Sequence, residues 1–194
     1  MFQRGFKTWC EKVALEVRTE LGLSATDPLK PEGLAEYLEV RLWTPANLAG
    51  LSQQTLSTLS AEAHNWSAVT VSFNGRYAVV YNPSHAPGRR SSDIMHELAH
   101  LITGHDPSKV LLSQDGTVAL RSFNRQQEEE AAWLSGCLLL PRPTLVLIAR
   151  TQIGVERACQ EYGVSDDMLD YRLKVTGVEI QMKRRSRSRS APTR

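Results

Sequence analysis

Apolar residues near the start of the chain recur with the spacing of an amphipathic helix. Four large apolar residues lie four positions apart, namely Trp9, Val13, Val17 and Leu21. This spacing places them on one face of a helix, and Gly22 is typical of the position just after a helix end. We predict a helix over residues 6–21, a short second helix over 32–38 and a short strand over 40–43.

The middle of the chain contains two segments rich in β-branched and aromatic residues. WSAVTVSF covers residues 66–73 and RYAVVY covers residues 76–81. They are separated by Asn74-Gly75, a dipeptide typical of a tight hairpin turn. The pattern predicts two antiparallel strands. Residues 44–62 stay open between a helix and a loop, because their many Ser and Thr residues weaken the helical pattern.

Two strongly apolar helices are predicted in the second half of the chain. The first, SSDIMHELAHLITGH, has Ser91 or Ser92 as the expected N-cap and ends at Gly104. The second runs from Gln126 to Leu140 and is stopped by Pro141.

The remaining segments of the second half are less regular. Residues 105–125 form a mostly polar connection with room for a short strand over 116–120. Residues 144–178 read as helical and include two short helices on either side of 163–165.

The first of the two apolar helices carries the motif H-E-x-x-H at His96, Glu97 and His100. Residues four apart lie on the same face of a helix, so both imidazoles can reach one metal ion. Glu97 lies one residue round from His96, where a carboxylate can accept a proton from a metal-bound water. The pattern is typical of a zinc-dependent peptidase with Glu97 as its general base.

A catalytic zinc needs a third protein ligand, and the sequence offers two kinds. His105 is near in sequence, but it lies beyond Gly104 and its side chain would have to fold back. The longer motif with Gly at 103 and His at 106 is absent, because Thr103 and Asp106 stand there.

A carboxylate on the next helix is the other kind of third ligand. Glu128, Glu129 and Glu130 open that helix. Acidic residues in a first turn also simply favour the helix dipole. Glu128 shares a face with Ala131 and Ser135, small residues that allow close helix packing, so spacing favours Glu128 and leaves Glu130 open.

These residues resemble a known family, the ImmA/IrrE-type metallopeptidases. Its pattern is H-E-[LI]-x-H-x-x-x-x-H followed by E-x-x-A-x-x-F-A-x-x-L-[LM]-x-P. The chain matches this pattern at ten positions: His96, Glu97, Leu98, His100, His105, Glu128, Ala131, Leu138, Leu139 and Pro141. It departs at Leu134 and Ser135, where the family has Phe and Ala, and both changes keep a small or apolar side chain. The resemblance extends more weakly over residues 10–178.

The resemblance implies a gluzincin-like site with Zn²⁺ held by His96, His100 and Glu128 and with Glu97 as general base. It implies an α+β fold, in which a small mixed or antiparallel sheet packs on the H-E-x-x-H helix and a small helical segment follows. It also implies a protein substrate, a helix-turn-helix transcriptional repressor in a bacterial or phage regulatory circuit.

We divide the chain into three parts. Residues 1–143 are expected to form the zinc metallopeptidase core, and residues 144–180 a helical segment that resembles a helix-turn-helix. Residues 181–194 are expected to be a disordered basic tail. Residues 183–194 hold six Lys or Arg and no acid, which leaves 17 basic and 21 acidic residues in the rest of the chain, a net charge of −4. Such a tail could contact nucleic acid non-specifically or simply be solvated.

Composition narrows the cellular setting. The three cysteines, Cys10, Cys137 and Cys159, are odd in number and widely spaced, which argues against a disulfide framework and a cysteine zinc site. No stretch reaches the roughly 18 apolar residues of a membrane span, and the N-terminus lacks the apolar core of a signal peptide. We expect a cytoplasmic protein.

Two other functions compete with the peptidase hypothesis. Glu156–Gly163, Val164-Ser165 and Asp166–Val175 together resemble a DNA-binding helix-turn-helix. Three acids, Asp166, Asp167 and Asp170, make the second helix a poor match for phosphate, so docking of the substrate is the preferred role of this segment. The second competitor is an interaction protein of the toxin–antitoxin type with a vestigial or structural zinc site.

Overall fold

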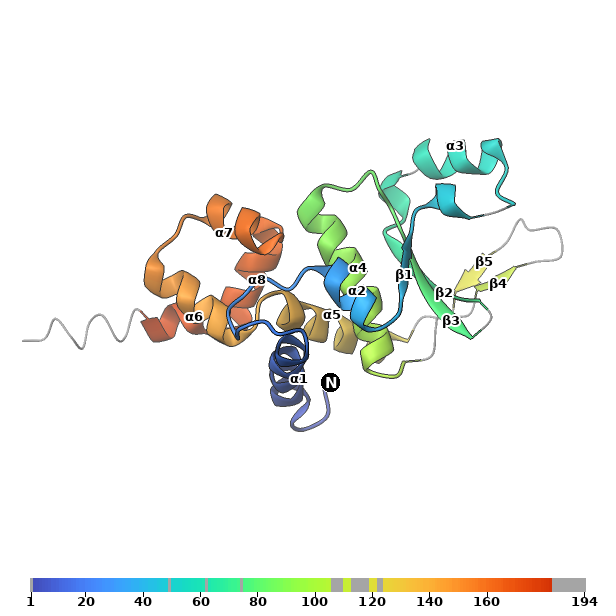
Figure 1. Ribbon diagram of the computed structural model, residues 1–194. Helices are drawn as coiled ribbons and strands as arrows, with labels where there is room; N and C mark the ends of the chain where they lie inside the picture. Colours follow the sequence, from blue (N-terminus) through green and yellow to red (C-terminus); the bar gives the residue numbers. More distant parts are fainter. Residues whose placement is uncertain are drawn as a thin grey trace, which may run out of the picture.

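The chain folds into a small sheet, a central helix and a largely helical remainder (Figure 1). The computed structural model describes residues 2–48, 50–61, 63–73, 75–105, 110–112, 119–121 and 124–182. Its elements, in chain order, are α1 (Phe6–Glu20), α2 (Pro31–Tyr37), β1 (Arg41–Trp43), η1 (Pro45–Asn47), α3 (Gln53–Ala61), η2 (Ala63–Asn65), β2 (Ala68–Phe73), β3 (Arg76–Tyr81), α4 (Pro87–Ile102), β4 (Val110–Leu112), β5 (Ala119–Arg121), α5 (Arg125–Leu139), α6 (Arg142–Thr151), α7 (Val155–Tyr162) and α8 (Asp166–Thr176).

The main sheet is mixed and has the strand order β1-β3-β2. β2 and β3 pair antiparallel, with Thr70 opposite Val79, and β1 joins β3 in parallel. The hairpin and the first strand predicted from sequence are thus confirmed, although Asn74 itself lies outside the described residues. β2 is an edge strand of this sheet, and both β2 and β3 contact the motif-bearing helix α4.

The N-cap of the motif-bearing helix α4 lies five residues before the first of the two expected caps. Its N-cap is Ala86, and Pro87 stands at the first helical position. The prediction of Ser91 or Ser92 as N-cap is therefore wrong. Proline is common at this position because its fixed φ suits a helix, and because a backbone N–H at the first helical position would have no partner within the helix. Inside the helix, the Ser92 hydroxyl donates to the Gly88 carbonyl at 3.1 Å.

Helix α4 lies between the sheet on one side and α5 on the other (Figure 1). Its apolar residues Ile94, Met95, Leu98 and Ala99 are buried. Helix α5 starts at the Asn124 cap, whose side chain accepts from the N–H groups of Gln126 and Gln127, and it is buried along most of its length. The predicted α+β architecture, a small sheet packed on the H-E-x-x-H helix, is confirmed.

The C-terminal helices α6, α7 and α8 share the hydrophobic core of the rest of the chain. Five of their buried side chains, together with Val164 in the turn between α7 and α8 and Val178 beyond α8, belong to the same cluster as α4 and α5; the five are Leu145, Ile148, Ala158, Tyr162 and Leu169. The predicted boundary at 143/144 stays a prediction, and α6 begins two residues before it. The basic tail lies outside the described residues from residue 183 on.

The turn between α7 and α8 packs directly against the start of α4. A Cβ atom added at Gly88 would lie 2.6 Å from the nitrogen of Ser165 and 2.6 Å from the carbonyl carbon of Val164. Both are backbone atoms, which cannot rotate away as a side chain can. Glycine at position 88 therefore permits a contact between two segments that are about 75 residues apart in sequence, by the numbering.

Arg172 and Glu11 connect α8 and α1 to the end of α5. Arg172 is fully buried, donates to the Leu140 carbonyl at 3.1 Å and pairs with Glu11 at 2.6 Å. Glu11 also accepts from the backbone N–H of Arg142 at 2.9 Å, at the start of α6. One carboxylate on α1 thus holds both α6 and α8.

Among the described residues, no single helix has both the length and the hydropathy to cross a membrane. α5 and α6 reach that length and hydropathy only when taken together, across a bend of 50°.

The contact at Gly88 predicts an unusually costly glycine-to-alanine change. Gly88→Ala should lower the free energy of unfolding by about 1–3 kcal/mol, the usual cost of overpacking, and so lower the melting temperature by several degrees. The matched control is Gly33→Ala in α2, where an added Cβ meets no atom within 4 Å and helix propensity favours alanine. Thermal unfolding of both variants measures the difference, and equal melting temperatures would show that the turn does not depend on position 88.

Candidate metal centre and cleft

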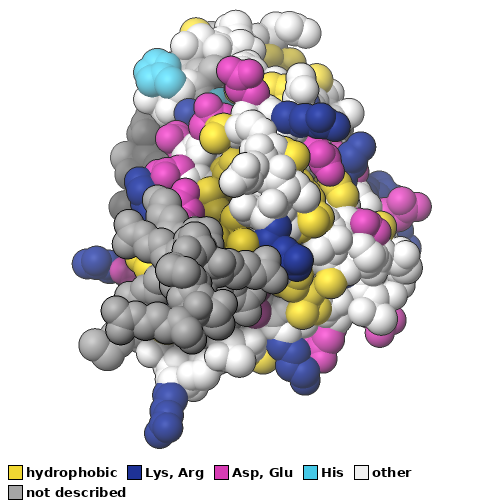
Figure 2. All heavy atoms as spheres, turned by 90° about the vertical axis from the view of Figure 1, so that its left-hand side faces the viewer, with side chains coloured by type: hydrophobic (Ala, Val, Ile, Leu, Met, Phe, Trp, Pro, Cys, Tyr) yellow, Lys and Arg dark blue, Asp and Glu magenta, His cyan; other side chains and the backbone are white. Residues whose placement is uncertain are grey.

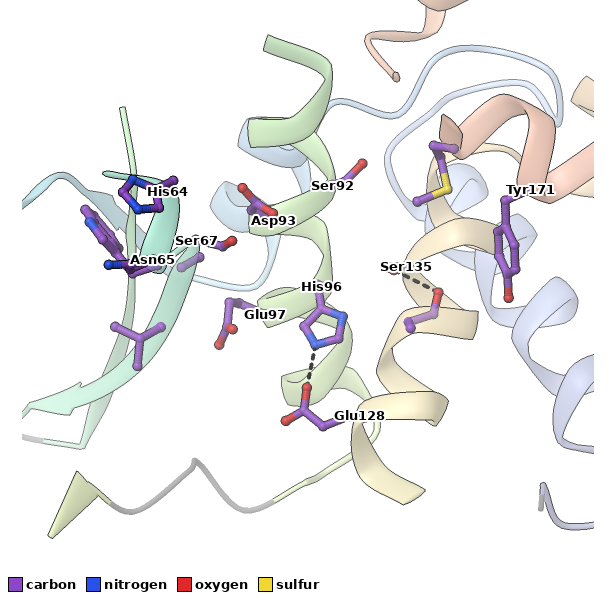
Figure 3. A pocket seen from close by; sticks show the side chains of 15 residues that line it. His64, Asn65, Ser67, Ser92, Asp93, His96, Glu97, Glu128, Ser135 and Tyr171 are labelled. Carbon is purple, nitrogen blue, oxygen red and sulfur yellow. Dashed lines mark hydrogen bonds and ion pairs between the residues drawn. The ribbon is translucent and has the colours of Figure 1, made fainter. Parts of the chain in front are cut away.

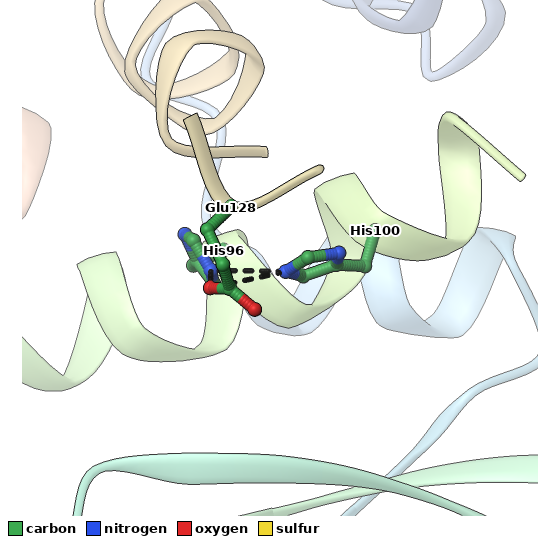
Figure 4. Close-up of side chains that lie close together, drawn as sticks. All are labelled: His96, His100 and Glu128. Carbon is green, nitrogen blue, oxygen red and sulfur yellow. Dashed lines mark hydrogen bonds and ion pairs between the residues drawn. The ribbon is translucent and has the colours of Figure 1, made fainter. Parts of the chain in front are cut away.

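Two residues of α4 and one of α5 converge on a single point (Figure 4). The Nε2 atoms of His96 and His100 are 3.1 Å apart. Glu128 Oε2 lies 3.1 Å from His96 Nε2 and 3.6 Å from His100 Nε2. One turn of helix separates the two histidines, and the first turn of α5 brings the carboxylate against them. We refer to these three residues as the triad.

The spacing of the three atoms fits a tetrahedral metal ion. With bonds of about 2.0–2.1 Å, two ligand atoms of a tetrahedral zinc site lie roughly 3.3–3.4 Å apart. The distances in the triad, 3.1, 3.1 and 3.6 Å, bracket this value. Two imidazoles and one carboxylate are also the donor set of a common class of catalytic zinc site, which leaves a fourth position for water. The residues present therefore fit the metal that the motif implies.

The environment of His100 favours the neutral imidazole that a metal requires. Burial, and secondly the neighbouring His96 ring, lower the pKa of His100 from its ordinary value, against the opposite effect of Glu128. A lowered pKa keeps the ring uncharged to more acidic pH. Because only an unprotonated nitrogen can bind a metal, His100 is ready for coordination at neutral pH.

The other candidate ligands from the sequence lie outside the triad, next to it. His105 does fold back, and its Nδ1 atom lies 3.0 Å from Nδ1 of His100. Its Nε2 atom is 3.1 Å from Oε2 of Glu130. Glu129 points away and pairs with Arg125 on the exposed side of α5. The structure thus groups Glu128 with the two motif histidines, and Glu130 with His105.

Glu97 faces the sheet rather than α5. Its side chain is buried, and its Oε2 atom accepts from the Thr70 hydroxyl at 2.7 Å and from the Thr70 backbone N–H at 2.9 Å. Figure 3 shows Glu97 on the side of α4 toward β2, while His96 points toward Glu128. His96 and Glu97, which are adjacent on α4, therefore contact two different parts of the fold, α5 and the sheet. The contribution of Thr70 was not foreseen, because a threonine in a predicted strand carries no signal for its partner 27 residues away.

A cleft of about 730 Å³ opens beside the triad. One wall is formed by the segment before β2 and the strand itself, with Trp66, Ala68 and Val69, and another by Met168 and Tyr171 of α8 (Figure 3). His96, Glu97 and Glu128 also line it. The sequence did not identify these wall residues, since nothing in a local pattern indicates that α8 and the segment around β2 line the same cleft.

Asp93 is a charged residue of α4 in the wall of the cleft. In the structure it lies in the second turn, lines the cleft and pairs with Nδ1 of His85 at 2.6 Å. This pair links the loop before α4 to the same face of the helix as His96.

Among solved structures, the chain is similar to a Mycobacterium tuberculosis transcriptional regulator, with a TM-score of 0.52 and 17% sequence identity. The similarity covers 86% of this chain and 46% of the regulator, so the chain spans about half of that protein's length. At this identity the similarity shows the fold alone. No curated protein sequence matches the chain.

Residues 52–174 match the peptidase family M78, described as the IrrE N-terminal-like domain. The matched region contains the hairpin, the triad, Glu97 and the C-terminal helices up to most of α8. This agrees with the resemblance seen in the two motifs. With well over half of its residues matched, the chain belongs to the IrrE N-terminal-like (M78 peptidase) family.

Proposed function

We propose that the protein is a zinc-dependent endopeptidase, with His96, His100 and Glu128 as metal ligands and Glu97 as general base. The observation that carries the proposal is the convergence of the three ligand atoms at tetrahedral spacing on the wall of an open cleft. Membership of a metallopeptidase-type family supports the reaction class.

Each residue of the proposed site has a separate task. Bound zinc would supply Lewis-acid polarisation of a peptide carbonyl and would lower the pKa of a bound water to about 7. Glu97 is proposed to accept the proton of that water and to pass it to the leaving amine. Thr70 fixes the orientation of the Glu97 carboxylate with two hydrogen bonds. The edge strand that supplies Thr70 therefore also aligns the proposed base.

We propose a protein substrate, specifically a helix-turn-helix transcriptional repressor in a bacterial or phage circuit, and therefore a cytoplasmic location. The family supports a protein substrate, and the resemblance in the motifs supports the repressor. The solved structure of a transcriptional regulator with a similar fold is weakly consistent with a regulatory role. The cleft is open and mixes apolar with polar walls, as an extended peptide requires.

DNA binding through α7 and α8 is the less favoured function. The turn between these helices is packed on α4 at Gly88, and Leu169 and Arg172 of α8 are buried. Met168 and Tyr171 of α8 line the cleft. The helix that would have to enter a DNA groove is thus already engaged by the peptidase core.

The charges on the same helices also disfavour DNA. Five exposed acids on α7 and α8 outnumber two exposed bases; the acids are Glu156, Glu161, Asp166, Asp167 and Asp170, and the bases are Arg157 and Lys174. Figure 2, which views the molecule from this end, shows acidic and basic side chains interspersed. A phosphate backbone is bound by clustered positive charge.

The first test is metal content. The purified protein should bind about one zinc per chain, and the double variant His96→Ala, His100→Ala should bind none at that site. Glu128→Gln should weaken binding, because a neutral amide is a poorer zinc ligand. Glu129→Gln is the matched control, an exposed neighbour on the same helix. Elemental analysis measures the zinc content of the four proteins. Equal zinc in the wild type and the double variant would contradict the assignment of the ligands.

The second test separates the base from the ligands. Glu97→Gln should retain zinc and the fold but lower the hydrolysis rate by at least about 100-fold, the usual contribution of a general base. The measurement is cleavage of candidate repressors, followed by mass spectrometry, with Glu129→Gln as control. A Glu97→Gln variant that cleaves at the wild-type rate would exclude Glu97 as base. A zinc-loaded wild type that cleaves no repressor would favour the interaction protein with a structural or vestigial site.

A further inference from the structure

The end of α4 bends back on itself and carries His105 to the motif. Gly104 has φ 69°, a left-handed conformation that glycine adopts without strain. The His105 N–H donates to the His100 carbonyl at 3.0 Å, and the Gly104 N–H donates to the Leu101 carbonyl at 3.1 Å. This pair of bonds is the Schellman motif of helix C-termini. As a result the His105 ring lies beside the ring of His100.

A chain of polar contacts runs from the triad through His105 to a carboxylate. Nε2 of His100 faces the other two residues of the triad, 3.1 Å from Nε2 of His96. Nδ1 of His100 lies on the other side of the ring, 3.0 Å from Nδ1 of His105. His105 Nε2 lies 3.1 Å from Oε2 of Glu130, and the other oxygen of Glu130 accepts from the Gln126 amide at 2.9 Å. The side chains of His105 and Glu130 are only 8% and 14% exposed, whereas that of Glu129 is 41% exposed.

One arrangement of protons satisfies every contact in this chain. A metal-binding Nε2 of His100 must carry a lone pair, so the proton of that ring is on Nδ1. His100 Nδ1–H then donates to His105 Nδ1, which must be the acceptor nitrogen. The proton of His105 is consequently on Nε2, where it donates to the Glu130 carboxylate. The carboxylate at the far end therefore selects the tautomer of both rings.

We propose that His105 and Glu130 are positioning residues that hold His100 in the tautomer and orientation required for metal binding. The inference rests on the proposed function, because it concerns a ligand of the proposed zinc site. The two residues bind no metal themselves. They act through His100, as carboxylates and carbonyls behind metal-bound histidines do in general.

The cap at the end of α4 does not by itself explain the contacts. A Schellman motif requires glycine at position 104 but no particular side chain at 105. A carboxylate near the start of α5 would favour the helix dipole equally well if it stood in solvent. Withdrawing the Glu130 carboxylate from water carries a desolvation cost, which its contacts with His105 and Gln126 offset.

The main experiment measures zinc affinity by competition with a chelator of known affinity. His105→Phe and Glu130→Leu should each weaken zinc binding about 10–100-fold, the usual effect of losing such a partner. Glu130→Gln, which keeps a neutral acceptor, should lose less than Glu130→Leu. Glu129→Gln should bind as the wild type does. The melting temperature of each metal-free variant serves as the control for folding.

Two outcomes of this experiment would overturn the proposal. The first is zinc affinity within about twofold of wild type in folded His105→Phe and Glu130→Leu proteins, against the 10–100-fold loss that a positioning role predicts. The second is an equal loss in Glu129→Gln. If His105→Phe fails to fold, the zinc affinity of the folded Glu130→Leu variant decides in its place.

A second readout needs no metal. Imidazole ¹⁵N chemical shifts of the metal-free wild type should place the proton of His100 on Nδ1 and that of His105 on Nε2, and Glu130→Leu should mix the His100 tautomers. The opposite tautomers in the wild type would contradict the proposal. A wild type that binds no zinc would instead overturn the proposed function, while these shifts would still decide whether His105 and Glu130 orient His100.

Discussion

The backbone carbonyl groups at the end of helix α5 need hydrogen-bond donors inside the protein, and the rest of the structure depends on which residues supply them. The last carbonyl groups of a helix have no partner within it, and those of α5 are buried. Arg18 donates to the Leu138 carbonyl at 2.8 Å, and Arg172 donates to the Leu140 carbonyl at 3.1 Å. Burial lowers the pKa of Arg18 to about 10, so it still carries its charge at neutral pH. Two cations thus fix the end of the helix whose first turn carries Glu128.

This anchoring explains how a site built from separate layers keeps its geometry. A Cβ atom added at Gly136 would lie only 2.9 Å from Cδ of Arg172. The lack of a side chain at position 136 therefore leaves room for the Arg172 side chain to reach the end of α5. With α5 fixed, α4 is held between it and the sheet. His96 then meets Glu128 on one side, and Glu97 meets Thr70 on the other. A shift of α5 or of β2 by about 1 Å would disturb the alignment that the proposed catalysis needs.

The parts of the site that a local pattern encodes were predictable from sequence, and the parts that depend on tertiary contact were not. The spacing of His96 and His100 follows from the helical repeat. The hairpin follows from two β-rich segments around Asn74-Gly75, and the two long helices follow from their apolar content and flanking residues. The beginning of α4 at Pro87 was missed, because two serines looked like better caps than a proline-led start. The pairing of His105 with Glu130 was missed, although both residues had been singled out, because spacing tells which face a side chain occupies and not what lies opposite.

The C-terminal helices show most clearly that a local sequence pattern does not predict tertiary contacts. Their sequence resembles a helix-turn-helix, yet Val164 in the turn is buried and packed on α4, and Tyr171 of the second helix stands in the wall of the cleft. Arg172, one residue further along, is anchored to Glu11. Successive residues of α8 therefore face the cleft and the core. Because the same helix is tied to the end of α5 and lines the cleft, the contacts that stabilise the fold also set the shape of the cleft, and the segment is part of the proposed peptidase site.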